Sequence, residues 1–132
     1  MKKLVECVPN ISEGNDQSII NEVVSSVKNY PGIKLLNVDP GKATNRTVIT
    51  FVGEAEIIVD AAFNLIEKAK GLIDMSNHTG EHPRMGAVDV CPLIPISGIT
   101  MEETVKLAYR LSERVGNELS IPVYCYELSL IH

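Results

Sequence analysis

The chain has few cysteines, no cluster of basic residues and no long apolar run. Its 132 residues include 3 cysteines, and its formal net charge is −5. Proteins that bind nucleic acid carry basic patches, so this charge argues against nucleic acid as a partner. No apolar stretch approaches the length of a membrane span, and the short run after the first two lysines is too short for a signal-peptide core. These absences predict a cytoplasmic protein that binds neither nucleic acid nor membrane.

The cysteines are Cys7, Cys91 and Cys125, an odd number, far apart in the sequence and each inside an apolar run. Without a C-x-x-C pair, this pattern indicates reduced and buried side chains. A buried thiol in apolar surroundings is inert, so none of the three is expected to act as a nucleophile.

Length and composition indicate one ordinary globular domain. The chain is 45% hydrophobic and 22% charged, and 132 residues can bury a core without disulfides or metal. No repeat, linker or low-complexity tract divides it. We therefore expect a single domain over residues 1–132.

Apolar periodicity predicts five strands and three helices. The expected strands span residues 4–9, 33–39, 46–52, 87–96 and 123–128. The expected helices carry apolar stripes over residues 19–27, 57–69 and 108–119. Gly71 should close the second helix, and the capping-box spacing of Thr100 and Glu103 should open the third. Pro92 and Pro95 lie inside the fourth strand, which should therefore sit at a sheet edge or carry a bulge.

The expected order of elements is β-α-β-β-α-β-α-β. Its first six elements match the split βαβ, or ferredoxin-like, pattern, in which two helices cover one face of an antiparallel sheet. The sequence thus predicts an α+β fold, a ferredoxin-like sandwich with a mainly antiparallel sheet.

Residues 74–95, DMSNHTGEHPRMGAVDVCPLIP, hold an unusual density of ionisable groups for a loop. His78, Glu81, His82 and Arg84 lie within seven positions. Catalytic and binding groups concentrate in loops that a rigid scaffold holds, and histidine can exchange a proton near neutral pH. This segment is the first candidate for chemistry.

The string His78–His82 also matches H-x-x-E-H, a zinc-peptidase signature. That motif works on a helix, where residues four apart share a face. Gly80 interrupts it and Pro83 follows it, and neither suits a helix, nor is a third ligand obvious downstream. We therefore expect no metal. The alternatives left open are a solvated surface loop and a functional loop in which the backbone around His82 is fixed.

Residues 39–46, DPGKATNR, are the second candidate. The Gly-Lys pair resembles part of a phosphate loop, but Leu36 stands where the first glycine should be and Ala43 replaces the Ser/Thr after the lysine. A polar loop between strands is the simpler interpretation. The functional alternative is that Asp39 and Arg46 reach the same cleft as His82. The loop at residues 10–15 is interpreted as a turn and the start of a helix.

Three strings carry a resemblance to a known family: LVECVPNISEG at residues 4–14, NRTVITFVG at 45–53 and LIDMSNHTGEHPRMGAVDVCPLIP at 72–95. With them the chain resembles the N-terminal subdomain of the glutamate formimidoyltransferases, the formiminotransferase domain of formiminotransferase-cyclodeaminase. The resemblance implies an enzyme of histidine degradation with a ferredoxin-like subdomain. It also implies transfer of a formimino group from N-formimino-L-glutamate to N5 of tetrahydrofolate as co-substrate, with His82 as the catalytic histidine.

The residue types suit this chemistry. Attack of the folate nitrogen on the amidine carbon gives a tetrahedral intermediate, which expels glutamate only if the glutamate nitrogen is protonated. His82 can remove the first proton and deliver the second. From residue type alone, Arg84 or Arg46 could hold a substrate carboxylate, and Asp39 or Glu81 could orient the imidazole.

In the family the transferase domain has a second subdomain of similar size, and the folate site lies in the cleft between the two. The chain ends just after the strand where the first subdomain should end, so we expect it to lack the C-terminal subdomain. The expected partners are formiminoglutamate, folate and further copies of this chain in a homo-oligomer, and a separate C-terminal-half chain is a candidate partner. The alternatives are a non-catalytic module that binds folate or a partner, and a zinc hydrolase.

Overall fold

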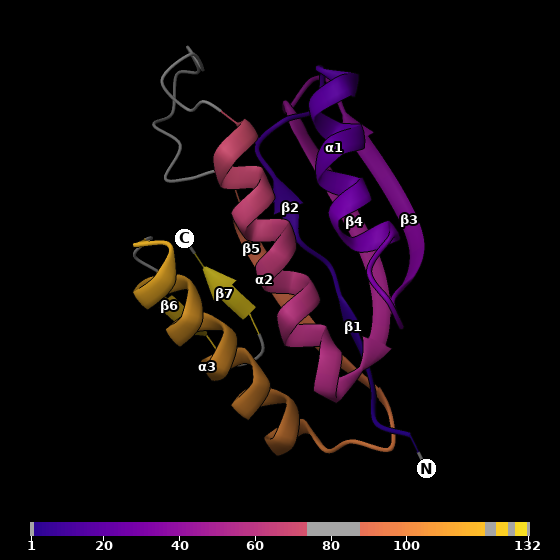
Figure 1. Ribbon diagram of the computed structural model, residues 1–132, viewed down its shortest axis with the longest axis vertical. Helices are drawn as coiled ribbons and strands as arrows, with labels where there is room; N and C mark the ends of the chain where they lie inside the picture. Colours follow the sequence, from indigo (N-terminus) through magenta and orange to yellow (C-terminus); the bar gives the residue numbers. More distant parts are fainter. Residues whose placement is uncertain (1, 74–87, 121–123, 127–128, 132) are drawn as a thin grey trace.

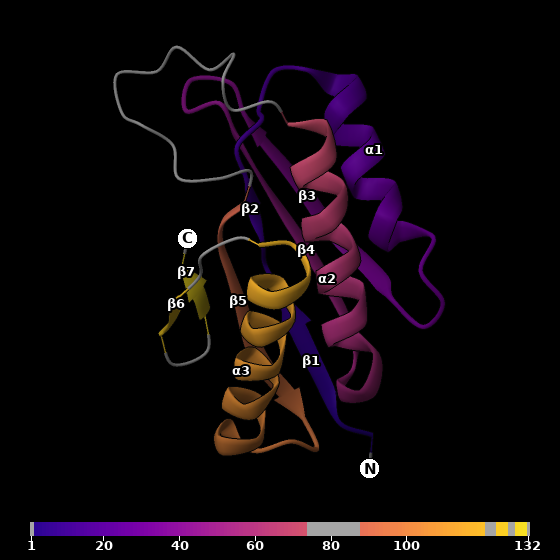
Figure 2. The same ribbon diagram turned by 60° about the vertical axis from the view of Figure 1, so that its left-hand side comes forward.

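The described residues form a two-layer sandwich of one antiparallel sheet and three helices. The computed structural model describes residues 2–73, 88–120, 124–126 and 129–131 (Figure 1). The helices are α1 (Gln17–Lys28), α2 (Ala55–Leu72) and α3 (Met101–Glu118). The strands are β1 (Leu4–Cys7), β2 (Asn10–Ile11), β3 (Lys34–Gly41), β4 (Arg46–Glu54), β5 (Val88–Ser97), β6 (Tyr124–Tyr126) and β7 (Ser129–Ile131). Figure 2 shows the described helices side by side on one face of the sheet.

The sheet is built around β1 and β2, which follow one another along its centre. Strand β4 pairs with both of them on one side, and β5 pairs with both on the other. Strand β3 lies outside β4, while β7 and then β6 lie beyond β5. With β1 and β2 taken as one strand, the first six elements have the split βαβ order, so the ferredoxin-like α+β prediction is confirmed. The third helix packs beside α2 and over β5.

The hydrophobic core lies between the sheet and the helices. Strand β4 shows the alternation directly: Thr47, Ile49 and Phe51 are fully buried, whereas Val48, between the first two, is only half-buried. Residues of one parity therefore face the helices, and those of the other parity face away from them. We call this second side the open face. Most residues of the predicted apolar stripes of α1, α2 and α3 are buried in the core, and Ile19 and Ile57, which begin the first two stripes, are half-buried.

Side-chain capping fixes the N-termini of α1 and α3, whereas the C-terminus of α2 lies next to a buried residue. The Asp16 carboxylate caps α1, and Thr100 forms the expected capping box with Glu103. Helix α2 does not end at Gly71 as predicted, because the chain stays helical to Leu72 and then buries Ile73 in the core. None of the described helices is long and apolar enough to cross a membrane.

The two prolines of β5 predicted either an edge position or a bulge, and the structure shows irregular pairing of the second kind. Strand β5 is an internal strand, paired with β1 and β2 on one side and with β7 on the other. Its pairings with β1 and with β2 each contain a register shift, and the shift with β1 falls at Pro95, which pairs with Val5. Pro92 lies in regular pairing, opposite Ser129 of β7.

The prediction of a single last strand over residues 123–128 was wrong in its bounds. The chain forms the two short antiparallel strands β6 and β7 there. The sequence between them contains no glycine, proline or asparagine, so the usual turn signal was missing.

The cysteine prediction is confirmed for the two cysteines whose side chains are described. Cys7 on β1 and Cys91 on β5 are buried and form no disulfide. They are 84 residues apart in the sequence, but their sulfur atoms lie 3.4 Å from each other. Burial raises the pKa of the Cys7 thiol well above its ordinary value, so that thiol stays protonated and is a poor nucleophile. The side chain of Cys125 lies outside the description.

The loop after β2 and the turn between β3 and β4 pack backbone against backbone at Gly14. A Cβ atom at this position would lie 2.3 Å from the carbonyl oxygen of Gly41 and 2.6 Å from the amide nitrogen of Arg46. Neither atom can rotate away, because both belong to the main chain. Glycine is therefore required here by close approach rather than by an unusual φ angle.

We expect Gly14→Ala to lower the free energy of unfolding by about 1–3 kcal/mol, the usual effect of forcing an extra carbon into packed structure. Gly71→Ala is the matched control, because a Cβ atom there meets no atom within 4 Å. Within helix α2, that change should raise stability by roughly 0.5–1 kcal/mol. Urea denaturation of both variants measures the difference, and a Gly14→Ala protein as stable as wild type would contradict the packing described here.

Candidate functional site

Three polar residues surround Val48 on the open face. Asp39 on β3 pairs with Val48, and Val48 pairs with Asn10 on β2. Arg46 lies two residues before Val48 on the same strand and so shares its face. Asn10 also pairs with Val90 on β5. We call Asn10, Asp39 and Arg46 the polar cluster.

The buried neighbours show which way the cluster faces. Ile11 and Thr47 are fully buried against the helices. Because successive side chains of a strand alternate between its two sides, Asn10 and Arg46 face away from the core. Arg46 and Asp39 are exposed, and Asn10 is half-buried. The cluster thus offers a carboxylate, a guanidinium and a carboxamide to anything that covers the open face.

Hydrogen bonds tie the loop after β2 to the turn between β3 and β4. The side-chain oxygen of Asn45 accepts from the Gly14 amide at 2.9 Å and from the Asn15 side chain at 2.8 Å. The Asn15 side chain also donates to the Lys42 carbonyl at 3.3 Å. Asn45 has a φ of 53°, a left-handed conformation that asparagine tolerates better than most residues. We call this set of contacts the Asn45 clamp.

The same loop is held from inside by Glu13, which is 8% exposed. Its carboxylate accepts from the amides of Asn15 at 3.1 Å and Asp16 at 3.0 Å, and the Thr47 hydroxyl donates to its carbonyl. The interpretation of residues 10–15 as a turn and helix start was therefore incomplete. The missed signal was the position of Glu13, whose carboxylate can accept hydrogen bonds from the backbone amides two and three residues later. The contact with Asn45, about 30 residues on, had no local signal.

The structure describes two of the five predicted site residues. It brings Asp39 and Arg46 to the same end of the open face. Glu81, His82 and Arg84 lie outside the described residues. The sequence that carries them leaves α2 after the buried Ile73 and joins the sheet at Val88, which pairs with Ile11. Val88, the first described residue after this segment, therefore lies on the strand next to Asn10, which pairs with Val90.

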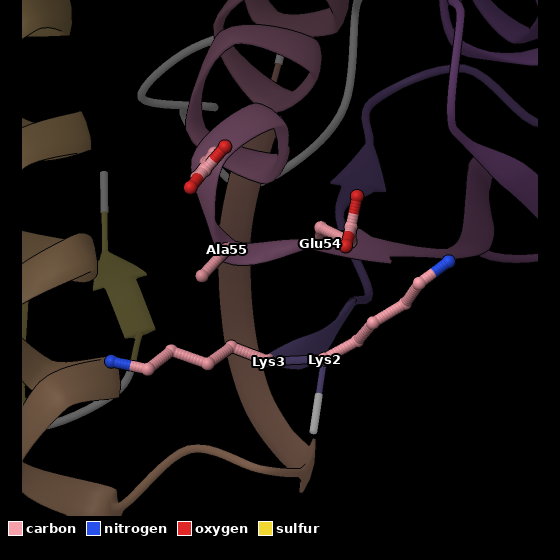
Figure 3. A pocket seen from close by; sticks show the side chains of 5 residues that line it. Lys2, Lys3, Glu54 and Ala55 are labelled. Atoms are coloured by element: carbon pink, nitrogen blue, oxygen red, sulfur yellow. The ribbon is translucent and has the colours of Figure 1, made fainter.

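An open depression of about 540 Å³ lies elsewhere, at the start of α2 (Figure 3). Its lining residues are Lys2, Lys3, Glu54, Ala55 and Glu56. The side chains of Lys2 and Lys3 point in opposite directions in Figure 3. Lys3 pairs with Glu103, and that hydrogen bond lowers the pKa of the glutamate. Since Glu54 and Arg46 stand at opposite ends of β4, the depression is separate from the polar cluster and lacks convergent groups.

In the described part of the chain, no group of three or more histidine, cysteine, aspartate or glutamate side chains is placed to hold a metal ion. The polar cluster is instead suited to an organic ligand with charged and hydrogen-bonding groups. Arg46 can bind a carboxylate, while Asn10 can both donate and accept a hydrogen bond.

Comparison with known proteins identifies the family to which the chain is similar. Residues 4–131 match the model of the formiminotransferase domain, N-terminal subdomain. The chain is 53% identical over 126 residues to the formimidoyltransferase-cyclodeaminase of Mus musculus, covering 96% of this chain and 23% of that protein. It is 47% identical over 127 residues to the glutamate formimidoyltransferase of Streptococcus pyogenes serotype M1, covering 96% and 42%. It is 49% identical over 123 residues to the glutamate formimidoyltransferase of Thermoplasma acidophilum, covering 93% and 41%.

These relatives are all longer than the chain. It spans about a quarter of the mouse protein and about two-fifths of the two microbial proteins. The match nevertheless covers nearly every residue of the chain and falls on one subdomain. The chain therefore belongs to the family of the formiminotransferase domain, N-terminal subdomain.

Proposed function

We propose that this chain supplies the histidine-bearing half of a glutamate formimidoyltransferase. The observation that carries the proposal is the match over residues 4–131 to a formiminotransferase subdomain, with relatives named for formimidoyl transfer at about half identity. The polar cluster supports it, because its groups suit a substrate with carboxylates and hydrogen-bonding edges. The proposed reaction moves a formimino group from N-formimino-L-glutamate to N5 of tetrahydrofolate, without a metal.

In the proposed mechanism His82 moves one proton across the reaction. The folate nitrogen attacks the formimino carbon, a C–N bond forms, and His82 takes the proton from that nitrogen. The bond from the formimino carbon to the glutamate nitrogen then breaks as His82 returns a proton to the leaving amine. Arg46 or Arg84 would hold a glutamate carboxylate, and Asp39 or Glu81 would orient the imidazole. These are roles that residue type permits.

The open face supports a second layer of protein over the site. Ile94 and Ile96 on β5 are 40% and 50% exposed, and Val52 on β4 is half-buried beside them. Glu6 pairs with both Val52 and Ile94, so an acidic side chain lies between apolar ones. Contiguous exposed apolar surface marks an interface when it is large enough, and these residues are candidates for part of such a patch. We propose that the second subdomain of the transferase, on this or a separate chain, covers this face and completes the substrate site.

We expect His82→Ala to reduce formimino transfer by about 10²–10⁴-fold in the assembled transferase, the usual contribution of a general acid–base group. His78→Ala, a change of the other histidine in the same segment, is the matched control and should retain most activity. Both proteins should unfold at the same urea concentration as wild type. The measurement is steady-state transfer from formiminoglutamate to tetrahydrofolate.

Wild-type turnover by the His82→Ala protein would rule out His82 as the acid–base group. Loss of activity on dialysis against a chelator, restored by zinc, would instead favour the hydrolase-type site that Gly80 and Pro83 argue against. Tight folate binding with no transfer by any assembled form would favour the alternative, a non-catalytic folate-binding module.

When this chain is produced without the second subdomain, the uncovered open face should make it self-associate, with a homodimer the simplest closed form. Light scattering at micromolar concentration should give a mass about twice that of one chain. Ile94→Lys places a charge on the open face and should shift the protein to monomer. Met101→Lys is the control, because Met101 is 58% exposed and lies on helix α3 rather than on the sheet. A strictly monomeric wild type would contradict the prediction.

A further inference from the structure

Asn10 is an unexplained polar side chain at the centre of the open face. It lies on the two-residue strand β2, between β4 and β5, and it is half-buried. Among the described residues, its carboxamide has no hydrogen-bond partner. An amide left without a partner when a surface is covered costs about 1–3 kcal/mol. If the second subdomain covers this face, Asn10 needs a partner within the covered space.

The surroundings of Asn10 indicate a flat ligand. Val48 and Val90 stand on either side of it and offer an apolar floor. Asp39 lies on the far side of Val48. Adjacent strands are about 4.8 Å apart, so the backbones of Asp39 and Asn10 are separated by roughly 10 Å. A planar ring can lie over Val48 with one edge at the carboxamide.

Hydrogen-bond chemistry selects between the two proposed substrates. A carboxamide presents a donor and an acceptor side by side. The pterin ring of tetrahydrofolate carries a matching pair, a ring N–H next to a carbonyl group. Formiminoglutamate is a flexible chain with two carboxylates, which a guanidinium such as that of Arg46 binds better. The apolar floor beside Asn10 likewise suits a ring rather than two charges.

The backbone of Asn10 is held on both sides in the sequence. The carbonyl of Pro9, just before it, accepts from the Ile49 amide at 3.0 Å. After Ile11 the chain is fixed by the buried Glu13 and by the Asn45 clamp. A binding residue on a rigid main chain loses little conformational freedom when its ligand arrives.

We propose that Asn10 is a substrate-binding residue that pairs with the amide-like edge of the tetrahydrofolate pterin. This assignment rests on the proposed transferase function and deepens it, because it places the pterin over Val48 and beside β2.

The test compares Asn10→Ala and Asn10→Asp with wild type in the assembled transferase. Asn10→Asp keeps the shape of the side chain but replaces its donor with a negative oxygen. The dissociation constant for 5-formyltetrahydrofolate, measured by titration calorimetry, should rise about 10–100-fold in both variants, the loss of one or two hydrogen bonds. The KM for tetrahydrofolate should rise with it, while the KM for formiminoglutamate should stay within about twofold if the carboxamide serves only the pterin. Asn37→Ala is the control, because Asn37 is exposed on β3 and pairs with Thr50 on the same face.

Unchanged folate affinity in both variants would overturn the assignment, and so would a rise confined to the KM for formiminoglutamate. If Asn10→Ala fails to fold by circular dichroism, the isosteric Asn10→Asp protein decides the question. If wild-type enzyme transfers no formimino group, the proposed function fails. The calorimetric comparison still decides whether Asn10 binds the folate.

Discussion

Hydrogen bonding on both edges of residues 4–11 is the constraint on which the rest of the fold depends. Strands β1 and β2 each pair with β4 on one side and β5 on the other. One set of their side chains, including Val5, Cys7 and Ile11, is fully buried beneath the helices. The other set, Glu6 and Asn10, is thereby forced onto the open face. A shift of one residue in this register would exchange the two sets, so the core and the candidate site are specified together.

The division of the sheet into a covered and an open face also accounts for the proposed function. The three described helices cover one face of the sheet, and no described element covers the other. The open side combines exposed aliphatic residues near Ile94 with polar residues near Asn10, an arrangement expected of an interface that also holds a ligand. A site shared between two layers excludes water only when both are present. In the proposed enzyme, the histidine-bearing half would provide the reacting groups and their orientation, and the covering half would enclose the substrates.

The spacing of apolar and capping residues predicted those features of the fold that local interactions determine. The buried stripes of α1, α2 and α3, the capping box at Thr100 and the split βαβ order all follow from residue spacing, and they are present in the structure. Tertiary contacts decided the rest. Helix α2 continues past Gly71 to Leu72, next to the buried Ile73, and β5 lies inside the sheet with an irregular pairing at Pro95.

The candidate site was only partly predictable for the same reason. Asp39 and Arg46 were singled out by residue type, and strand pairing brings them to one face. Asn10 was overlooked, because its significance comes from the register of three strands and no short motif encodes that. The Asn45 clamp joins residues about 30 positions apart, so a single sequence gives no sign of it.

The central claim is that this chain holds half of a site completed by a covering subdomain. The most direct test is to measure formimino transfer from formiminoglutamate to tetrahydrofolate before and after mixing the chain with a separately produced C-terminal subdomain from a relative. The account predicts little or no transfer by either part alone and transfer that saturates as the second part is added. Full transfer by the chain alone would contradict the account, and so would a stable complex of the two parts that transfers nothing.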